Sequence, residues 1–146
     1  DEEAGQKITP HVIEPTFGLN RSMLVTLLEA YTEDAENDRV YLKLPARIAP
    51  YKAAVFPLLA NKPELGKLAR TIYDDLRKEY MVAWDDRGNI GKRYYSQDEI
   101  GTPYCVTVDF DSLEKKDVTV RNRDTAKQER IKIGELGNFL HGKIFD

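Results

Sequence analysis

The stretch AAVFPLLANKPELGKLARTIYDDLRKEYMVAW, residues 53–84, decides the fold class. It begins with a short, nearly continuous apolar run, which is typical of a buried parallel strand. From Pro63, a residue that suits the first turn of a helix, apolar side chains recur on one face through about Tyr80. MVAW, residues 81–84, is a second short apolar run. This order predicts a strand–helix–strand unit with two parallel strands and a right-handed crossover.

The chain that follows continues the alternation of strand and helix patterns. A helix is expected from about Gly91 through the DEIG segment at residues 98–101. Strands are predicted at PYCVTVDF (103–110) and DVTVRNR (117–123), with the SLEKK turn between them, and at QERIKI (128–133) after a turn at RDTAK. A final helix is expected around residues 135–141. The result is an α/β domain whose mixed sheet is parallel at its start and antiparallel near its end.

The chain before this unit shows a different organisation. HVIEPTFGLNR, residues 11–21, predicts a strand, a tight turn at Phe17-Gly18 and the start of a helix that runs from Leu19 to Tyr31. TEDAENDR, residues 32–39, is acidic and lacks periodicity, so we interpret it as a linker that contains a domain boundary. VYLKLP, residues 40–45, alternates like a strand.

Composition excludes several classes of protein. The apolar fraction of 41% and the charged fraction of 32% are those of a globular protein, and the apolar runs are shorter than the roughly 20 residues of a membrane span. The single cysteine, Cys105, rules out an internal disulfide framework, and the two histidines lie at opposite ends of the chain. The net charge of −3 combines an acidic leading segment with a mildly basic body. This distribution permits a nucleic-acid partner but is not evidence for one.

The second half of the chain carries the most suggestive polar residues. Ligands of parallel α/β sheets collect beyond the carboxyl ends of the strands, where Asp109 and Asp111 are expected. Arg121 and Arg123 alternate on one face of a predicted strand. Arginine forks, carboxylates and exposed rings suit unpaired bases. An alternative stays open, in which Arg121, Arg123, Asp98 and Asp111 form an ion-pair network without a ligand.

Four stretches together resemble the glycyl-tRNA synthetases of the archaeal/eukaryotic class II type. They are TPHVIEPTFGLNR, LPARIAPYKAAVFPL, GNIGKRYYSQDEIGTPYCVTVDFDSL and TVRNRDTAKQERIKI, and the resemblance runs from Thr9 to about Leu140. For residues 39–146 it implies the anticodon-binding domain that the glycyl, histidyl, prolyl and threonyl enzymes share, a three-layer α/β/α fold with a mixed five-stranded sheet. For residues 1–38 it implies the strand–helix remnant that ends a class II catalytic domain, followed by the linker.

HVIEPTFGLNR resembles the third signature motif of these enzymes. The resemblance implies that Arg21 is a catalytic residue that holds the triphosphate tail of ATP, as a planar and permanently charged fork can. It also implies that Glu14 and Thr16 line the glycine pocket. Thr16 stands where serine is usual and keeps the hydroxyl group. Asn20 stands where an acid or glycine is expected, which bears on the orientation of Arg21.

The resemblance further implies that a tRNA anticodon docks on the sheet edge and loops of residues 39–146. Arginines are expected to contact base edges and phosphates, acids to accept hydrogen bonds from cytosine amino groups, and a phenylalanine to stack. Glycine anticodons end in two cytosines, so amino donors are what the site must recognise. The predicted contact residues are Arg93, Gln97, Asp98, Glu99, Phe110, Asp111, Arg121 and Arg123.

The implied activity is that of a glycine–tRNA ligase, which activates glycine with ATP and transfers it to tRNA(Gly). ATP and Mg²⁺ are expected to serve the full-length enzyme, a cytoplasmic homodimer whose first two signature motifs lie upstream of Asp1. This chain alone is expected to be inactive, to hold no metal, and to have neither membrane nor DNA as partner. Two alternatives stay open. One is a non-enzymatic relative, either a polymerase accessory subunit or a protein-interaction module, and the other is a prolyl, threonyl or histidyl homologue.

Overall fold

The computed structural model describes residues 3–7 and 9–145. Its centre is a five-stranded sheet in the order β4-β3-β5-β6-β7. The strands are β3 (Ala53–Pro57), β4 (Val82–Trp84), β5 (Tyr104–Val108), β6 (Asp117–Asn122) and β7 (Gln128–Lys132). Strand β3 pairs in parallel with β4 and β5, whereas β6 pairs antiparallel with β5 and β7. The mixed five-stranded sheet predicted from the sequence is therefore confirmed.

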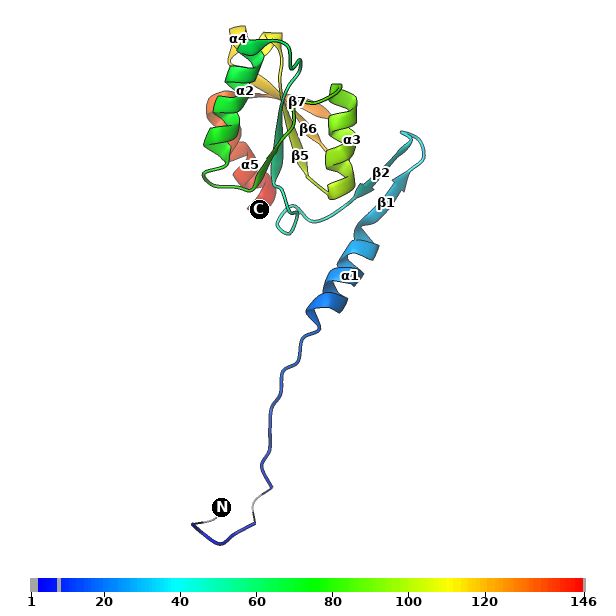
Figure 1. Ribbon diagram of the computed structural model, residues 1–146, viewed down its shortest axis with the longest axis vertical. Helices are drawn as coiled ribbons and strands as arrows, with labels where there is room; N and C mark the ends of the chain where they lie inside the picture. The colour runs from blue at the N-terminus through cyan, green and yellow to red at the C-terminus, as the bar shows by residue number, and fades with distance from the viewer. Residues whose placement is uncertain (1–2, 8, 146) are drawn as a thin grey trace.

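Helices cover both faces of this sheet, which makes the three-layer architecture (Figure 1). Helices α2 (Pro63–Leu76) and α5 (Leu136–Phe145) lie on one face, and α5 follows the short 3₁₀ helix η1 (Ile133–Glu135). There Leu65, Ile72 and Leu140 pack in the main core with strand residues such as Val106. Helix α3 (Ile90–Ile100) lies on the other face. The apolar spacing on α2 thus marks the side that the sheet buries.

The segment interpreted as a linker is instead a β-hairpin. Strand β1 (Tyr31–Asp34) pairs antiparallel with β2 (Arg39–Leu42) in a separate two-stranded sheet. The Asp34 carboxylate accepts hydrogen bonds from the backbone and side chain of Asn37, which stabilises the turn. The sequence of β1 has no apolar alternation that would predict a strand, because this strand lies at the surface with polar side chains on both faces. The predicted domain boundary after residue 38 falls within the hairpin and stays a prediction.

The leading segment contains the predicted helix but not the predicted strand. Helix α1 (Leu19–Ala30) begins where the pattern placed it. Residues 9–18 form no regular structure and run away from the sheet, so the strand expected at Val12-Ile13 is wrong for this structure (Figure 1). A strand needs a neighbour that takes up its backbone hydrogen bonds, and none of the described strands pairs with this segment. Val12 and Ile13 are 77% and 94% exposed.

Two connections differ from the sequence-based expectation. The turn predicted at SLEKK is the short helix α4 (Phe110–Lys115), which Asp109 caps by accepting a hydrogen bond from the Ser112 backbone N–H at 3.0 Å. Helix α2 ends at Leu76 rather than near Tyr80.

No helix among the described residues is long and apolar enough to cross a membrane.

Candidate nucleic-acid interface

The most deeply buried polar residue of the predicted interface is Asp98, on the last turn of α3. Its Oδ1 and Oδ2 accept hydrogen bonds from Arg121 Nη1 and Nη2 at 2.8 and 2.9 Å. Oδ2 also accepts from Arg39 Nη1 at 3.0 Å, and Arg39 Nε donates to Asp34 Oδ2 at 2.8 Å. We call these four residues (Asp34, Arg39, Asp98 and Arg121) the Asp98 cluster. Burial opposes the charged form of Arg121, but the hydrogen bonds to Asp98 outweigh it and raise the pKa of Arg121.

Arg123 and Arg93 are also buried, and both donate mainly to backbone carbonyls. Arg123 donates to the carbonyls of Gly101 and Leu44 at 2.7 and 2.9 Å. Arg93 donates to the carbonyls of Pro57 and Gly88 at 2.6 and 2.9 Å. Buried carbonyl groups need such partners, so both arginines hold loop ends in place.

The structure contains the ion pair of Arg121 and Asp98 that the alternative reading expects, whereas Arg123 and Asp111 lie outside that pair. Gln97 is buried as well and accepts a hydrogen bond from the Thr102 hydroxyl at 2.7 Å. That these residues contact RNA stays a prediction.

The structure separates the predicted contact residues into two groups. Because β6 runs antiparallel to β5, Arg121 lies opposite Cys105 at the amino end of β5. Asp98, Glu99 and Arg123 lie at this same end, as the Arg121–Asp98 pair and the Arg123–Gly101 bond show. With Arg121, we call these residues the amino-end group. The other group lies at the carboxyl ends of β3 and β5, where Arg93 meets Pro57 and α4 follows β5. This second group, which we call the carboxyl-end group, contains Arg93, Phe110 and Asp111.

Two members of the carboxyl-end group have exposed side chains. Phe110 is 50% exposed, and Asp111 is exposed beside it in the first turn of α4. Asp111 accepts a hydrogen bond from Lys115 at 3.1 Å. An open ring next to a carboxylate is suited to stacking a base and accepting from its amino group.

Arg130, on β7, is a further residue at this edge that the sequence interpretation missed. Its Nη1 donates to Asp109 Oδ2 at 2.7 Å and its Nε to Asp117 Oδ1 at 3.0 Å. These hydrogen bonds raise the pKa of Arg130, and the bond from Arg130 lowers the pKa of Asp117. Because Asp109 caps α4, Arg130 indirectly fixes the turn that carries Phe110. The alternation in QERIKI could have pointed to Arg130, because it places this residue outside the apolar face of the strand. In the structure Arg130 lies opposite Thr119.

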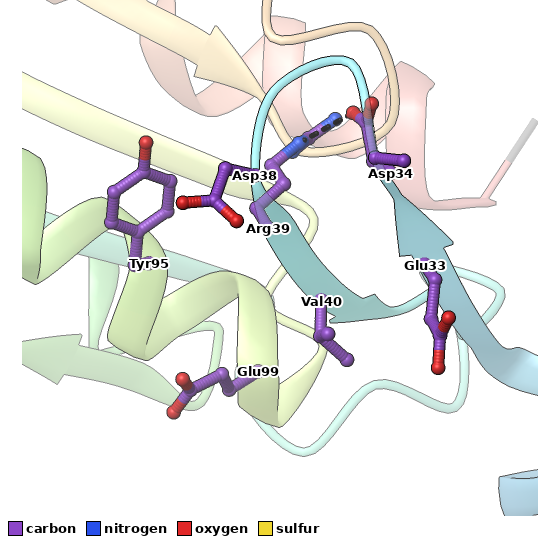
Figure 2. A pocket seen from close by; sticks show the side chains of 8 residues that line it. Glu33, Asp34, Asp38, Arg39, Val40, Tyr95 and Glu99 are labelled. Carbon is purple, nitrogen blue, oxygen red and sulfur yellow. Dashed lines mark hydrogen bonds and ion pairs between the residues drawn. The ribbon is translucent and has the colours of Figure 1, made fainter.

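The amino-end group borders an acidic hollow of about 430 Å³ between the hairpin and α3. Figure 2 shows the carboxylates of Glu33, Asp38 and Glu99 around it, with Tyr95 on the side of α3. Carboxylates repel the phosphates of a nucleic acid. The hollow therefore disfavours a phosphate backbone, and an RNA contact by Glu99 would have to be made to base amino groups.

The residues of the segment that resembles a third signature motif lie apart from both groups. Glu14 and Thr16 are exposed on the extended segment, and Arg21 is exposed in the first turn of α1. None of them lines the hollow between the hairpin and α3. The same region exposes the large apolar side chains of Val12, Ile13, Phe17, Leu19, Met23, Leu24, Val25 and Leu28. An apolar surface of this extent marks a contact with further protein.

Comparisons with known proteins agree with this fold. Residues 52–143 match the family described as the anticodon binding domain. The glycine–tRNA ligase of Streptomyces coelicolor is 46% identical over 151 residues, covering 99% of this chain and 33% of that protein. That of Thermobifida fusca is 49% identical over 151 residues (99% and 32%), and that of Corynebacterium efficiens is 51% identical over 147 residues (96% and 32%).

The matched relatives are much longer than this chain. The chain spans about a third of the length of the curated relatives that it matches. The family match covers the five-stranded sheet with α2 to α5 and begins after the hairpin. The chain belongs to the anticodon-binding domain family, and the relatives that it matches across nearly its whole length are glycine–tRNA ligases.

Proposed function

We propose that this chain is the anticodon-reading part of a glycine–tRNA ligase and that it acts within a longer protein. The observation that carries the proposal is the identity of 46–51% to glycine–tRNA ligases over 96–99% of the chain. This identity extends beyond the anticodon-binding domain into α1 and the segment before it. It favours a glycine enzyme over a prolyl, threonyl or histidyl enzyme and over a non-enzymatic relative.

In this proposal Phe110 and Asp111 of the carboxyl-end group contact the anticodon. Phe110 stacks on a base, and Asp111 accepts a hydrogen bond from a cytosine amino group. Glu99 is exposed and can accept from an amino group at the other end of the sheet. The buried residues support these contacts by holding the loops and α3. They are Arg93, Gln97, Asp98, Arg121 and Arg123.

The motif residues have a separate role in the longer protein. Arg21 binds the triphosphate of ATP, while Glu14 and Thr16 contact glycine, the carboxylate through the amino group of the substrate. All three side chains are exposed on this chain and open to such ligands. Among the described residues no three His, Cys, Asp or Glu side chains converge as metal ligands. We assign no step to the metal.

The longer protein is proposed to be a cytoplasmic homodimer that uses ATP, with a dimer interface outside this chain. The test is a glycylation assay with that protein, comparing tRNA(Gly) with a variant whose two anticodon cytosines are replaced. The expected result is a lower kcat/KM for the variant tRNA, because it lacks the amino donors. Equal kcat/KM values for the two tRNAs would contradict the proposal.

A further inference from the structure

The hairpin is the connection between α1 and the five-stranded sheet. Helix α1 ends at Ala30 and β1 begins at Tyr31, without an intervening residue. The Ala30 carbonyl also accepts a hydrogen bond from the Lys43 backbone N–H at 2.6 Å, which closes the base of the hairpin onto the helix. A change in the position of the hairpin therefore moves α1 with it.

The hairpin is not held by strand pairing to the domain. Strands β1 and β2 form a sheet of their own, and β2 packs against α3 instead (Figure 1). The apolar contact at this junction is small: Ala30, Leu44 and Ala49 are buried there, with Leu42 partly buried. Because the hydrophobic effect is non-directional, this cluster does little to define the orientation of the hairpin, whereas hydrogen-bonded ion pairs are directional.

Arg39 makes that interaction from the first residue of β2. Its side chain is 3% exposed and donates to Asp34 within the hairpin, to Asp98 on α3, and to the carbonyl of Arg123 at 2.7 Å. The guanidinium also lies over the Tyr41 ring, 4.6 Å from its centroid. One planar group thus joins the hairpin, the helix and the end of β6 in a single geometry.

Asp98 is the counterpart on the domain. Its side chain is wholly buried, and both oxygens bind Arg121 while one also binds Arg39. With Asp34 the four residues balance two negative and two positive charges. Buried charges bound in this way tolerate little displacement, because any displacement leaves one of them without its partner in a dry environment.

We propose that the Asp98 cluster is an ionic latch that fixes the orientation of α1 relative to the anticodon-binding domain. Arg39 and Asp98 are positioning residues of this latch and do not contact RNA. The functional consequence rests on the proposed function: the latch holds the anticodon surface at a set distance from Glu14, Thr16 and Arg21. The family match starts at residue 52, after the hairpin, so the latch joins the matched domain to the chain that precedes it.

The test measures the distance between α1 and α3 by pulsed electron paramagnetic resonance. Spin labels are placed on V25C and S96C, since both positions are exposed. Cys105 remains unlabelled because it is buried, and burial raises the pKa of its thiol. The doubly labelled chain is diluted with unlabelled chain so that only intramolecular distances contribute. The latch predicts one narrow distance distribution.

Arg39→Met is the variant that opens the latch. It removes the link to the hairpin but leaves the Arg121–Asp98 pair in the domain intact. We expect a broad or shifted distance distribution, with the near-ultraviolet circular dichroism of Trp84 unchanged. Arg77→Met is the matched control, because Arg77 is an exposed arginine that pairs with Asp74 at 3.4 Å. An unchanged distribution in Arg39→Met, or a broad one in the parent chain, overturns the proposal.

Asp34→Asn is a second variant that tests the latch if Arg39→Met fails to fold. Asp34 lies in the hairpin, so its substitution leaves the domain intact while it removes the negative charge of one partner of Arg39. A broadening smaller than that of Arg39→Met is expected. If Arg39→Met loses the Trp84 signal, an unchanged distribution in Asp34→Asn overturns the proposal by itself.

RNA binding separates this inference from the proposed function. An anticodon stem–loop of tRNA(Gly) is titrated into the parent chain and into Arg39→Met. A positioning role predicts dissociation constants within about twofold, well below the tenfold that corresponds to about 1.4 kcal/mol. A tenfold loss of affinity with unchanged distances makes Arg39 an RNA contact and overturns the latch. If the parent chain binds no stem–loop, the proposed function fails, whereas the distance measurement still decides the latch.

Discussion

Arg123 is a residue whose place in the structure changes its expected role. Its guanidinium satisfies the carbonyls of Gly101 and Leu44 in the interior. Removing it leaves buried acceptors without partners, which costs about 1–3 kcal/mol of stability per group. We expect Arg123→Ala to lower the free energy of unfolding in urea by that order and to weaken binding of all stem–loops alike.

Lys127→Ala is the control for this experiment, because Lys127 is an exposed side chain on the neighbouring turn. It should leave both the stability and the binding unchanged. A loss of affinity in Arg123→Ala that is confined to stem–loops with the two cytosines would show a base contact and contradict the structural role.

Arg130 links the stability of the α4 edge to pH. Its hydrogen bond lowers the pKa of Asp117 in the folded chain below the value of about 3.9 that an unperturbed aspartate has. This contribution is fully present above the unfolded pKa and is lost as the pH falls through the lower folded pKa. The stability difference between the parent chain and Arg130→Gln should therefore shrink as the pH falls below about 4. Urea unfolding across this range checks it, and a difference that is independent of pH would refute the coupling.

Among the elements, those with a buried apolar face were predictable. The spacing on α2 and the short apolar runs of β3 and β4 reflect their burial, so the strand–helix–strand unit follows from the sequence. Turn chemistry and surface hairpins carry weaker signals. β1 has no buried face, and α4 depends on the capping box of Asp109 and Ser112 rather than on periodicity.

The candidate site followed the same division. The sequence placed Arg121 beside α3, and the structure confirms this through the bond to Asp98. The predicted antiparallel turn at SLEKK carries Arg121 to the amino end of β5, away from Phe110, as the structure shows. Arg39 was assigned to a linker and missed, since its burial arises from contacts far along the chain.

The end of α3 provides a prediction at the scale of elements. Gly101 caps this helix with φ +83°, and an added Cβ would lie 2.8 Å from Leu44 Cδ1 and 3.1 Å from the Leu42 carbonyl oxygen. Gly101→Ala should lower the free energy of unfolding by more than about 1 kcal/mol. Gly66→Ala, inside α2 with open space around it, should raise this free energy by about 0.5–1 kcal/mol. Thermal unfolding of both variants measures the contrast, and equal shifts would contradict the close packing of α3 on β2.

At the scale of the molecule, residues 9–30 and the anticodon-binding domain differ in how much apolar surface they expose. The domain buries a complete core, whereas α1 and residues 9–18 leave their apolar side chains exposed. This contrast supports the proposal that Glu14, Thr16 and Arg21 act where further protein covers this segment.

This chain alone is therefore expected to catalyse no glycine-dependent ATP–pyrophosphate exchange, because Glu14, Thr16 and Arg21 lie exposed on it. Exchange above background with the purified chain would contradict this. In the longer protein, Arg21→Ala should impair adenylate formation while tRNA binding stays nearly intact. An unchanged exchange rate would reduce Arg21 to a surface arginine.

The measurement that tests the central claim most directly is a fluorescence titration of this chain with two anticodon stem–loops. One carries the glycine anticodon, and in the other its two cytosines are replaced. We predict tighter binding of the first by about 1–3 kcal/mol per lost base contact, at each of two salt concentrations. Phe110→Ala should weaken binding of the first by about 1–3 kcal/mol, whereas Phe145→Ala, an exposed phenylalanine at the end of α5, should not. Equal affinity for the two stem–loops, or no binding of either, would contradict the assignment of this chain as a reader of the glycine anticodon.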